Sequence, residues 1–125
     1  MKFSTSLKGN SAFRRLYAKG KSAAAPSLVV YFRKNGARAE GGGARTNRVG
    51  VTVTTKLGNA VQRNRVRRRL REIYRLNEPK IRPGLDIILV ARTRARFASY
   101  WELDRAFLTL CGKLNLFADN QRQTP

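Results

Sequence analysis

Apolar residues along this chain follow two spacings, one typical of helices and one typical of strands. Between residues 10 and 20 they recur at the i, i+3, i+4 spacing of an amphipathic helix, with arginine and lysine elsewhere. Asn10 is a candidate N-cap and Gly20 a candidate stop. The pattern predicts a short helix over residues 11–19, whose apolar members are Phe13, Leu16 and Tyr17.

Three segments have the composition or the alternation of β-strands. Residues 28–32 are rich in β-branched and aromatic side chains and are too short for a globular helix. In residues 48–54, valines alternate with glycine or threonine, which predicts a strand with one buried face and one small polar face. Residues 86–91 have the continuous apolar run of a buried strand.

Two further helices are predicted by capping-box pairs. Asn59 with Gln62 predicts the start of a helix that runs to about Leu76, before a proline. Ser99 with Glu102 predicts the start of a final helix, because an apolar stripe follows at helical spacing. That stripe consists of Leu103, Phe107, Leu110 and Leu114.

The length of the chain limits its organisation. A chain of 125 residues is long enough for one compact domain and too short for two ordinary ones, so we expect a single domain over residues 1–125. The glycine-rich residues 34–47 have no apolar period and are predicted to form a flexible loop. We expect order over about 7–117 and a frayed tail over 118–125.

The charge of the chain indicates the kind of partner that it binds. The chain has 27 Lys and Arg against 7 Asp and Glu, a formal net charge of +20 that a polyanion would neutralise. An anionic membrane is the alternative to nucleic acid, but no run approaches the roughly 20 apolar residues of a membrane span. The N-terminal residues also lack the apolar run of a signal peptide. The expected location is cytoplasmic, without a membrane partner.

The chemistry available to the protein is narrow. The sequence has no histidine and a single cysteine, which excludes internal disulfides, the usual zinc clusters and a histidine general base. Cys111 is interpreted as a small core residue. The seven carboxylates are scattered, whereas two-metal phosphodiester cleavage needs several that converge. We therefore expect no catalytic residue, no confidently assigned metal site and no bound cofactor in the protein itself.

The helix predicted after Asn59 is rich in arginine. Residues 63–75 contain seven arginines and one acid, Glu72, whereas a solvated helix face usually mixes the two signs. Its apolar residues share one arc and the arginines lie largely on the opposite side. Arginine suits RNA because its guanidinium binds phosphate with two hydrogen bonds and stacks on bases. The RNA-binding candidates are Arg63, Asn64, Arg65, Arg67, Arg68, Arg71 and Arg75.

A merely solvated face, a nuclear-localisation signal and a DNA-binding helix are the alternatives for such a basic run. The order of the motifs narrows these alternatives. A valine-rich strand from Arg48, the turn Lys56-Leu-Gly-Asn-Ala60 and the triplet Arg63-Asn64-Arg65 occur in succession. This succession closely resembles the signature of the bacterial ribonuclease P protein component, and the resemblance extends over roughly residues 7–115.

The resemblance implies a fold and a set of partners. The family fold is α+β, a single-domain α-β-β-β-α-β-α sandwich with a left-handed βαβ crossover through the arginine-rich helix. It implies one further strand, within Lys21 to Ala25 or beside the loop. The implied partners are the catalytic RNA subunit of ribonuclease P, with Mg²⁺ at the RNA active site, and precursor transfer RNA, whose 5′ leader the enzyme removes. No DNA partner is implied.

The resemblance also implies a cleft for the single-stranded leader, where aromatic rings and cations bind unpaired nucleotides. Its implied members are Phe13, Tyr17, Tyr31, Thr52, Lys56 and Arg67. Without the resemblance, Phe13 and Tyr17 would be assigned to the core, since aromatics four residues apart are usually buried. Strand alternation supports Tyr31 independently, because it places that ring beside Arg33 on the outer face.

Two rival classes stay open. A structural ribosomal protein would share the small size and the basicity. Long extended basic tails would favour that class, and this chain has none. A major-groove DNA-binding helix would mix arginine with base-reading side chains, of which only Asn64 and Gln62 are present. Trp101 is interpreted as a packing residue rather than an RNA platform.

Overall fold

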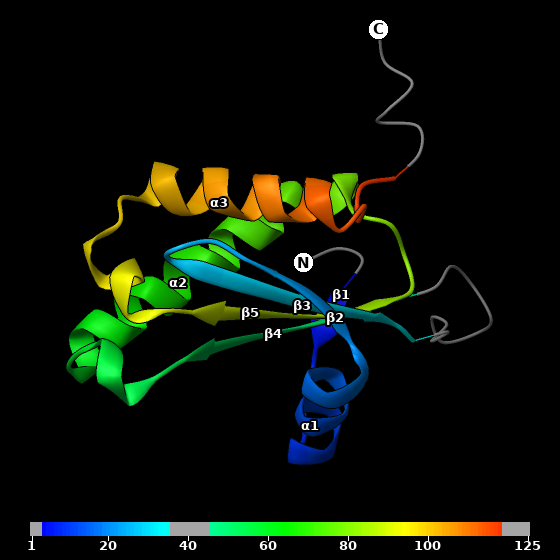
Figure 1. Ribbon diagram of the computed structural model, residues 1–125, viewed down its shortest axis with the longest axis horizontal. Helices are drawn as coiled ribbons and strands as arrows, with labels where there is room; N and C mark the ends of the chain where they lie inside the picture. The colour runs from blue at the N-terminus through cyan, green and yellow to red at the C-terminus, as the bar shows by residue number, and fades with distance from the viewer. Residues whose placement is uncertain (1–3, 36–45, 119–125) are drawn as a thin grey trace, which may run out of the picture.

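The computed structural model describes residues 4–35 and 46–118, which form a mixed sheet with helices on both faces (Figure 1). The elements are β1 (Ser4–Ser6), α1 (Asn10–Lys19), β2 (Lys21–Ala24), β3 (Leu28–Lys34), β4 (Asn47–Val53), η1 (Thr55–Leu57), α2 (Ala60–Asn77), η2 (Glu78–Lys80), β5 (Leu85–Ala91), η3 (Thr93–Phe97) and α3 (Tyr100–Lys113), where η marks a short 3₁₀ helix.

The sheet has five strands in the order β1-β4-β5-β3-β2. β4 and β5 are parallel neighbours joined through α2, and β3 runs antiparallel to both β5 and β2. α2 and α3 cover one face and α1 lies against the other (Figure 1). The predicted α+β sandwich is therefore confirmed, together with the crossover through the arginine-rich helix. The left hand of that crossover stays a prediction.

The N-terminal segment differs from the sequence prediction. β1 pairs in parallel with the first residues of β4 and gives the chain an additional leading strand, so the order is β-α-β-β-β-α-β-α. The described structure therefore begins at Ser4, ahead of the expected start at about residue 7. β1 has only three small polar residues, which carry no apolar alternation that could reveal a strand. β2 falls in the first of the two places expected for the additional strand.

Helix starts were predicted with mixed success. The Asn59 side chain accepts the Gln62 amide and the Gln62 side chain accepts the Asn59 amide, both at 2.9 Å, so this capping box is confirmed. The Ser99 hydroxyl accepts the Glu102 amide at 3.1 Å, which is one half of the second box. Asn10 was wrongly predicted as a cap, because Gly9 takes that position with φ 91°, a conformation that favours glycine.

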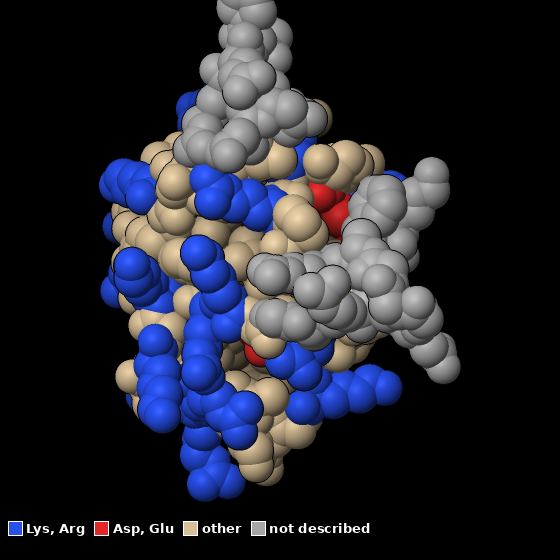
Figure 2. Space-filling model, turned by 90° about the vertical axis from the view of Figure 1, so that its right-hand side faces the viewer, with Lys and Arg blue, Asp and Glu red and all other residues tan. Residues whose placement is uncertain are grey.

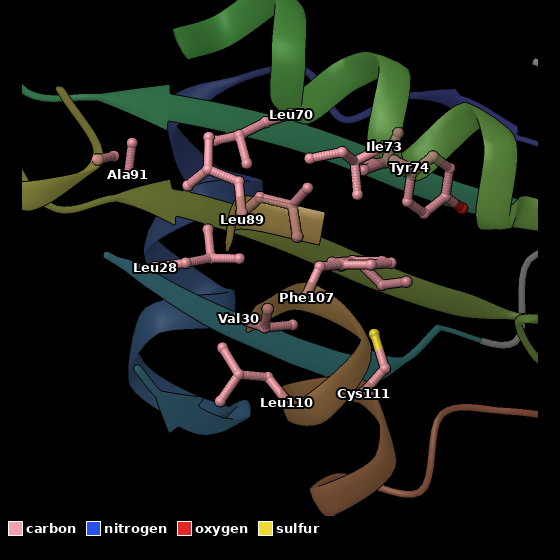
Figure 3. Close-up of a cluster of buried hydrophobic side chains, with 14 of the residues drawn as sticks. Leu28, Val30, Leu70, Ile73, Tyr74, Leu89, Ala91, Phe107, Leu110 and Cys111 are labelled. Atoms are coloured by element: carbon pink, nitrogen blue, oxygen red, sulfur yellow. The ribbon is translucent and has the colours of Figure 1, made fainter. Parts of the chain in front are cut away.

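A hydrophobic core fills the space between the sheet and the two helices α2 and α3 (Figure 3). Strands contribute side chains such as Leu28 and Leu89, and Phe107 of α3 lies edge-on to Tyr74 of α2 at 6.4 Å between ring centroids. Cys111 is fully buried there, as predicted, and burial raises the pKa of its thiol to about 12.

Polar contacts fix the ends of the parallel strands. The buried Asn47 side chain donates to the Arg82 carbonyl at 3.0 Å and accepts the Leu85 amide at 2.8 Å, so it ties the start of β4 to the start of β5. One residue on, Arg48 binds the Asp86 carboxylate through two hydrogen bonds of 2.7 and 2.8 Å. These bonds hold the two strands in register, which in turn sets the position of the side chains farther along β4.

The structure describes the ends of the predicted loop 34–47 and the first residue of the predicted tail 118–125. Lys34 and Asn47 belong to strands, and residues 36–45 lie outside the described part of the chain. The Ala118 amide donates to the Lys80 carbonyl at 2.8 Å, so the first residue of the predicted tail has a backbone partner. The rest of the predicted tail, 119–125, also lies outside the described residues.

Candidate nucleic-acid interface

The arginine-rich helix α2 has one buried face and one charged face. Val66, Leu70, Ile73 and Tyr74 are buried, as the helical spacing predicts. Three arginines on the outward side are exposed and form no hydrogen bond or ion pair with any other described residue. These three, Arg65, Arg68 and Arg71, are available for an external anion.

The other arginines of α2 are partly engaged within the protein. Arg63 donates to the Gly58 carbonyl at 3.0 Å, and Arg67 donates to the Asn64 side chain at 2.8 Å. Arg75 forms an ion pair with Glu72. The hydrogen bond from the Arg75 guanidinium holds the pKa of the Glu72 carboxyl below its ordinary value. The predicted RNA-binding set thus divides into free arginines and arginines that already have a partner.

Three aromatic rings of the predicted leader cleft form one cluster on the α1 face of the sheet. Tyr17 of α1 lies edge-on to Tyr31 of β3 at 4.9 Å between ring centroids, and Phe13 lies 6.4 Å from Tyr17. The Tyr17 hydroxyl is 3.5 Å from the Thr52 hydroxyl of β4. Tyr17 is 41% exposed, whereas Phe13 and Tyr31 are half-buried and pack partly on the small core under α1.

A groove of about 700 Å³ runs between this cluster and α2. Phe13 lies on one wall and Arg68, Arg71 and Arg75 lie on the other. Its floor includes Gly50 of β4, where a Cβ atom would approach the Phe13 ring to 2.7 Å. The remaining lining residues are Ser6, Leu7, Val49, Val51 and Glu72.

Gly50 and the edge of β4 are features that the sequence did not reveal. A glycine in a strand can mark a close approach of another group, and here the ring of Phe13 uses that space. β1 pairs only with Asn47 to Val49, so the later residues of β4 lie at the edge of the sheet beyond β1. The aromatic cluster and the arginine face therefore meet along an unpaired strand edge.

Two other predicted cleft residues, Lys56 and Arg67, do not join the aromatic cluster. Lys56 is exposed on η1, beyond the end of β4. Arg67 lines a separate groove on the outer side of α2, together with Val61, Asn64 and two of the free arginines. Within 4–35 and 46–118, no hydrogen bond or ring contact joins either residue to the three rings.

Basic residues also gather around the start of α1. On the face shown in Figure 2, lysine and arginine cover much of the lower half, where α1 lies, and acidic atoms form only small spots. A polar pocket of about 310 Å³ there is lined by Asp86 and by basic side chains from α1, from the segment just before it, and from β3 and β4. The basic members are Lys8, Arg15, Arg33, Lys34 and Arg48.

Trp101 was wrongly predicted to pack. Its side chain is 71% exposed, because it projects from the side of α3 away from the buried Leu103 and Phe107. It touches the ring of Tyr100 edge-on at 5.1 Å between centroids. Phe97, which the sequence did not single out, is 80% exposed on η3.

The acidic residues do not converge in the part of the chain that the structure describes. No group of three or more His, Cys, Asp or Glu side chains comes close enough there to hold a metal ion. Asp86 is engaged by Arg48, Glu72 by Arg75, and Asp104 accepts a hydrogen bond from Asn77 at 3.2 Å. Among the same residues, no helix is both long enough and apolar enough to cross a membrane.

An α+β domain that presents free arginines on one side of a groove and an aromatic cluster on the other side has the surface chemistry of a nucleic-acid-binding protein. The family model described as Ribonuclease P matches residues 1–115. This chain belongs to the ribonuclease P protein family.

Individual relatives agree with that assignment. The chain is 45% identical over 116 residues to the ribonuclease P protein component of Alkaliphilus oremlandii, covering 93% of this chain and 96% of the relative. The Staphylococcus aureus RNase P protein structure superposes with a TM-score of 0.76 at 30% identity, covering 93% of this chain and 98% of that one. The Thermotoga maritima RNase P protein gives a TM-score of 0.71 at 30% identity, with 83% and 92% covered.

Proposed function

We propose that this chain is the protein subunit of a ribonuclease P holoenzyme, an endoribonuclease that removes the 5′ leader of precursor transfer RNA. Family membership supports the holoenzyme assignment. The observation that supports an RNA-positioning role is the groove that has the Phe13 ring on one wall and the guanidinium groups of Arg68, Arg71 and Arg75 on the other.

The outward face of α2 and the aromatic cluster suit different parts of RNA. Arg65, Arg68 and Arg71 have no internal partner among the described residues, so their guanidinium groups can bind phosphates of the RNA subunit. Tyr17 and Tyr31 form an aromatic surface on which unpaired bases can stack. We assign the outward face of α2 to the RNA subunit and the aromatic cluster to the single-stranded leader.

The protein positions RNA and does not supply the reacting groups. It has no histidine, and its acids are apart from one another or engaged with arginine and asparagine. The cleavage chemistry is therefore assigned to the RNA subunit, where Mg²⁺ ions are expected at the active site. The cytoplasm, where transfer RNA precursors of bacteria are made, is the proposed location.

Reconstitution tests this function. Purified protein alone, supplied with Mg²⁺ and precursor transfer RNA, is expected to release no leader, and cleavage at the mature 5′ end is expected once the RNA subunit is added. The control is the RNA subunit alone at the same salt concentration, which isolates the contribution of the protein. Leader removal by protein that is free of RNA would contradict the proposal.

Recovery of the bound RNA from cells distinguishes the proposed function from the remaining alternative, a structural ribosomal protein. The bound RNA is expected to be one abundant structured species that processes precursor transfer RNA in the presence of Mg²⁺. Recovery of ribosomal RNA instead would favour a structural ribosomal protein.

A further inference from the structure

Two large aromatic side chains lie on the surface at the junction of η3 and α3. Phe97 is 80% exposed and Trp101 is 71% exposed, so neither contributes much to the core. The Arg96 guanidinium lies over the Phe97 ring, with its central carbon 5.2 Å from the ring centroid. This is the geometry of a cation–π contact, and it leaves the arginine at the surface beside the ring.

The surroundings of these rings are basic. A groove of about 460 Å³ beside Phe97 is lined by Arg94 of η3 and by Arg105 of α3, and Glu102 is the one acid in its wall. Arg105 follows Trp101 by four residues, so the two side chains are neighbours along one side of α3. We call these five residues, Phe97, Trp101, Arg94, Arg96 and Arg105, the η3 patch.

The η3 patch adjoins the arginine-rich helix. The Arg69 side chain of α2 donates to the Ala98 carbonyl, directly after η3, at 3.1 Å, and η3 packs against both α2 and η1. Figure 1 shows this turn in yellow beside the green start of α2. The aromatic cluster of Tyr17 and Tyr31 lies on the opposite face of the sheet, under α1.

Charge and shape together select the occupant. Three arginines against one acid favour an anion, and flat exposed rings beside guanidinium groups match nucleotides, whose bases stack while their phosphates bind the cations. A second copy of this chain would bring a further charge of +20 to the same surface and would be repelled. Because the patch continues α2 and is separated from the leader cleft by the sheet, the RNA subunit is the source of those nucleotides.

We infer that the η3 patch is a second RNA contact, at which unpaired nucleotides of the RNA subunit stack on Phe97 and Trp101. This inference rests on the proposed function, since it extends the RNA-subunit face from α2 to η3 and α3. Arg94, Arg96 and Arg105 neutralise the phosphates that flank the stacked bases.

Trp101 itself provides a direct measurement, because it is the only tryptophan in the chain. In the free protein, acrylamide should quench its fluorescence efficiently, since the indole is 71% exposed. Adding the RNA subunit should both quench the emission and protect it from acrylamide. Adding precursor transfer RNA to the assembled complex should cause no further change. An indole that stays equally accessible to acrylamide in the assembled complex would overturn the inference.

Paired variants test the energetic contribution. Replacing Phe97 and Trp101 together by alanine should weaken affinity for the RNA subunit roughly tenfold, which is within the range expected when one or two stacked bases lose their ring partner. Replacing both by tyrosine retains two ring faces and should preserve most of the affinity, and replacing both by leucine should not. Since both side chains are exposed, all three variants should keep the melting temperature of the parent chain.

The outcomes separate this inference from the function on which it rests. If the alanine variant binds the RNA subunit as tightly as the parent chain, the η3 patch is not an RNA contact, although the function stands. If the patch serves an acidic protein segment, RNA affinity is likewise unchanged, which also overturns the inference. If the parent chain itself does not bind the RNA subunit, the proposed function fails first. An unchanged ratio of precursor to product affinity in the alanine variant is the expected sign that the leader cleft is unaffected.

Discussion

At the scale of single residues, the three rings of the cleft combine packing with open surface. Phe13 fills the space above Gly50, and Tyr31 packs on the small core that contains Leu16 and Ile88. Tyr17 is the most exposed of the three and holds its hydroxyl near Thr52. A substitution at any of them therefore has both a structural and a binding component, and the design of a test must separate the two.

Tyr31 gives the cleanest test of leader binding. Replacing Tyr31 by alanine should weaken precursor binding by the holoenzyme about tenfold, because a stacking contact contributes on the order of 1–3 kcal/mol. Mature transfer RNA has no leader, so its affinity should hardly change. Binding of both RNAs to the reconstituted holoenzyme measures the ratio.

The matched control is Tyr31→Phe, which keeps the ring and should keep the preference for the precursor. The melting temperature and the affinity for the RNA subunit are measured for both variants. A parallel fall of stability and of both RNA affinities in the alanine variant would identify Tyr31 as a packing residue only.

Cys111 predicts a loss of stability at alkaline pH. Burial raises the pKa of its thiol to about 12, from an ordinary value of 9.0. Well below pH 9 the thiol is neutral in both states, and as pH rises through 9 towards 12 the unfolded chain loses the proton while the folded chain retains it. The free energy of unfolding should therefore fall as pH rises through this window, by up to about 1.4 kcal/mol per pH unit.

Thermal melts from pH 8 to 11 check this sign against a Cys111→Ala variant. Burial also raises the pKa of Tyr74, so the variant should retain part of the pH dependence. Its overall stability should be lower, because a buried side chain is truncated, but its decline with pH should be shallower. Equal slopes in the two proteins would remove Cys111 as a cause.

At the scale of elements, the sequence predicted best those features that depend only on residues close together in the chain. The capping box of Asn59 and the buried arc of α2 follow from spacing alone, and both are present. β1 could not be predicted, because its three polar residues become a strand only through pairing with β4. Gly9 replaces Asn10 as the cap because the chain enters α1 with positive φ, a conformation that favours glycine.

The same limit applies to the candidate site. Alternation placed Tyr31 on the correct face, and helical spacing separated the arginines from the core. The groove itself depends on the distance between α1 and α2 across β4, which no local pattern contains. Trp101 was misassigned because large aromatics are usually buried, although the helical spacing of α3 places this ring on the side opposite Leu103 and Phe107.

The free arginines of α2 predict a salt-dependent effect on assembly with the RNA subunit. Replacing Arg68 and Arg71 by alanine should weaken assembly with the RNA subunit and reduce the slope of log affinity against log salt, since fewer neutralised phosphates release fewer counterions. The magnitude of this slope should decrease by roughly one for each phosphate that no longer has an arginine partner. Titrations at several salt concentrations measure it.

A matched double variant, Lys80→Ala with Lys113→Ala, removes the same formal charge from exposed positions at the ends of other elements. This control should retain most of the salt slope of the parent chain. Equal slopes in the two double variants would show that net charge, rather than the α2 contact, governs assembly.

At the scale of the whole molecule, excess positive charge opposes the packing that the core supports. The sheet is covered on both faces, and the larger core between the sheet, α2 and α3 is continuous. The net charge of +20 opposes this packing through repulsion between basic side chains, which gather on α2, around α1 and on η3. An anion that binds only the folded chain therefore stabilises it twice, through its own contacts and by reducing repulsion.

Sulfate should consequently stabilise the isolated protein more than chloride does at equal ionic strength, where screening is the same. Sulfate also stabilises folded proteins by its general exclusion from their surface, so the part due to bound anion is the part that depends on the arginines. Binding to the folded state adds about 2.7 kcal/mol when the anion concentration is 100 times its dissociation constant. Melting temperatures in matched sulfate and chloride series measure the difference. The variant with Arg68 and Arg71 replaced by alanine should be the more stable protein at low salt, since two repelling charges are gone, and it should gain less from sulfate, since two anion ligands are gone. This crossing of the two curves distinguishes specific anion binding from general screening. Parallel curves for parent and variant would place the stabilising anion sites elsewhere on the surface, with the basic pocket around α1 as the next position to vary.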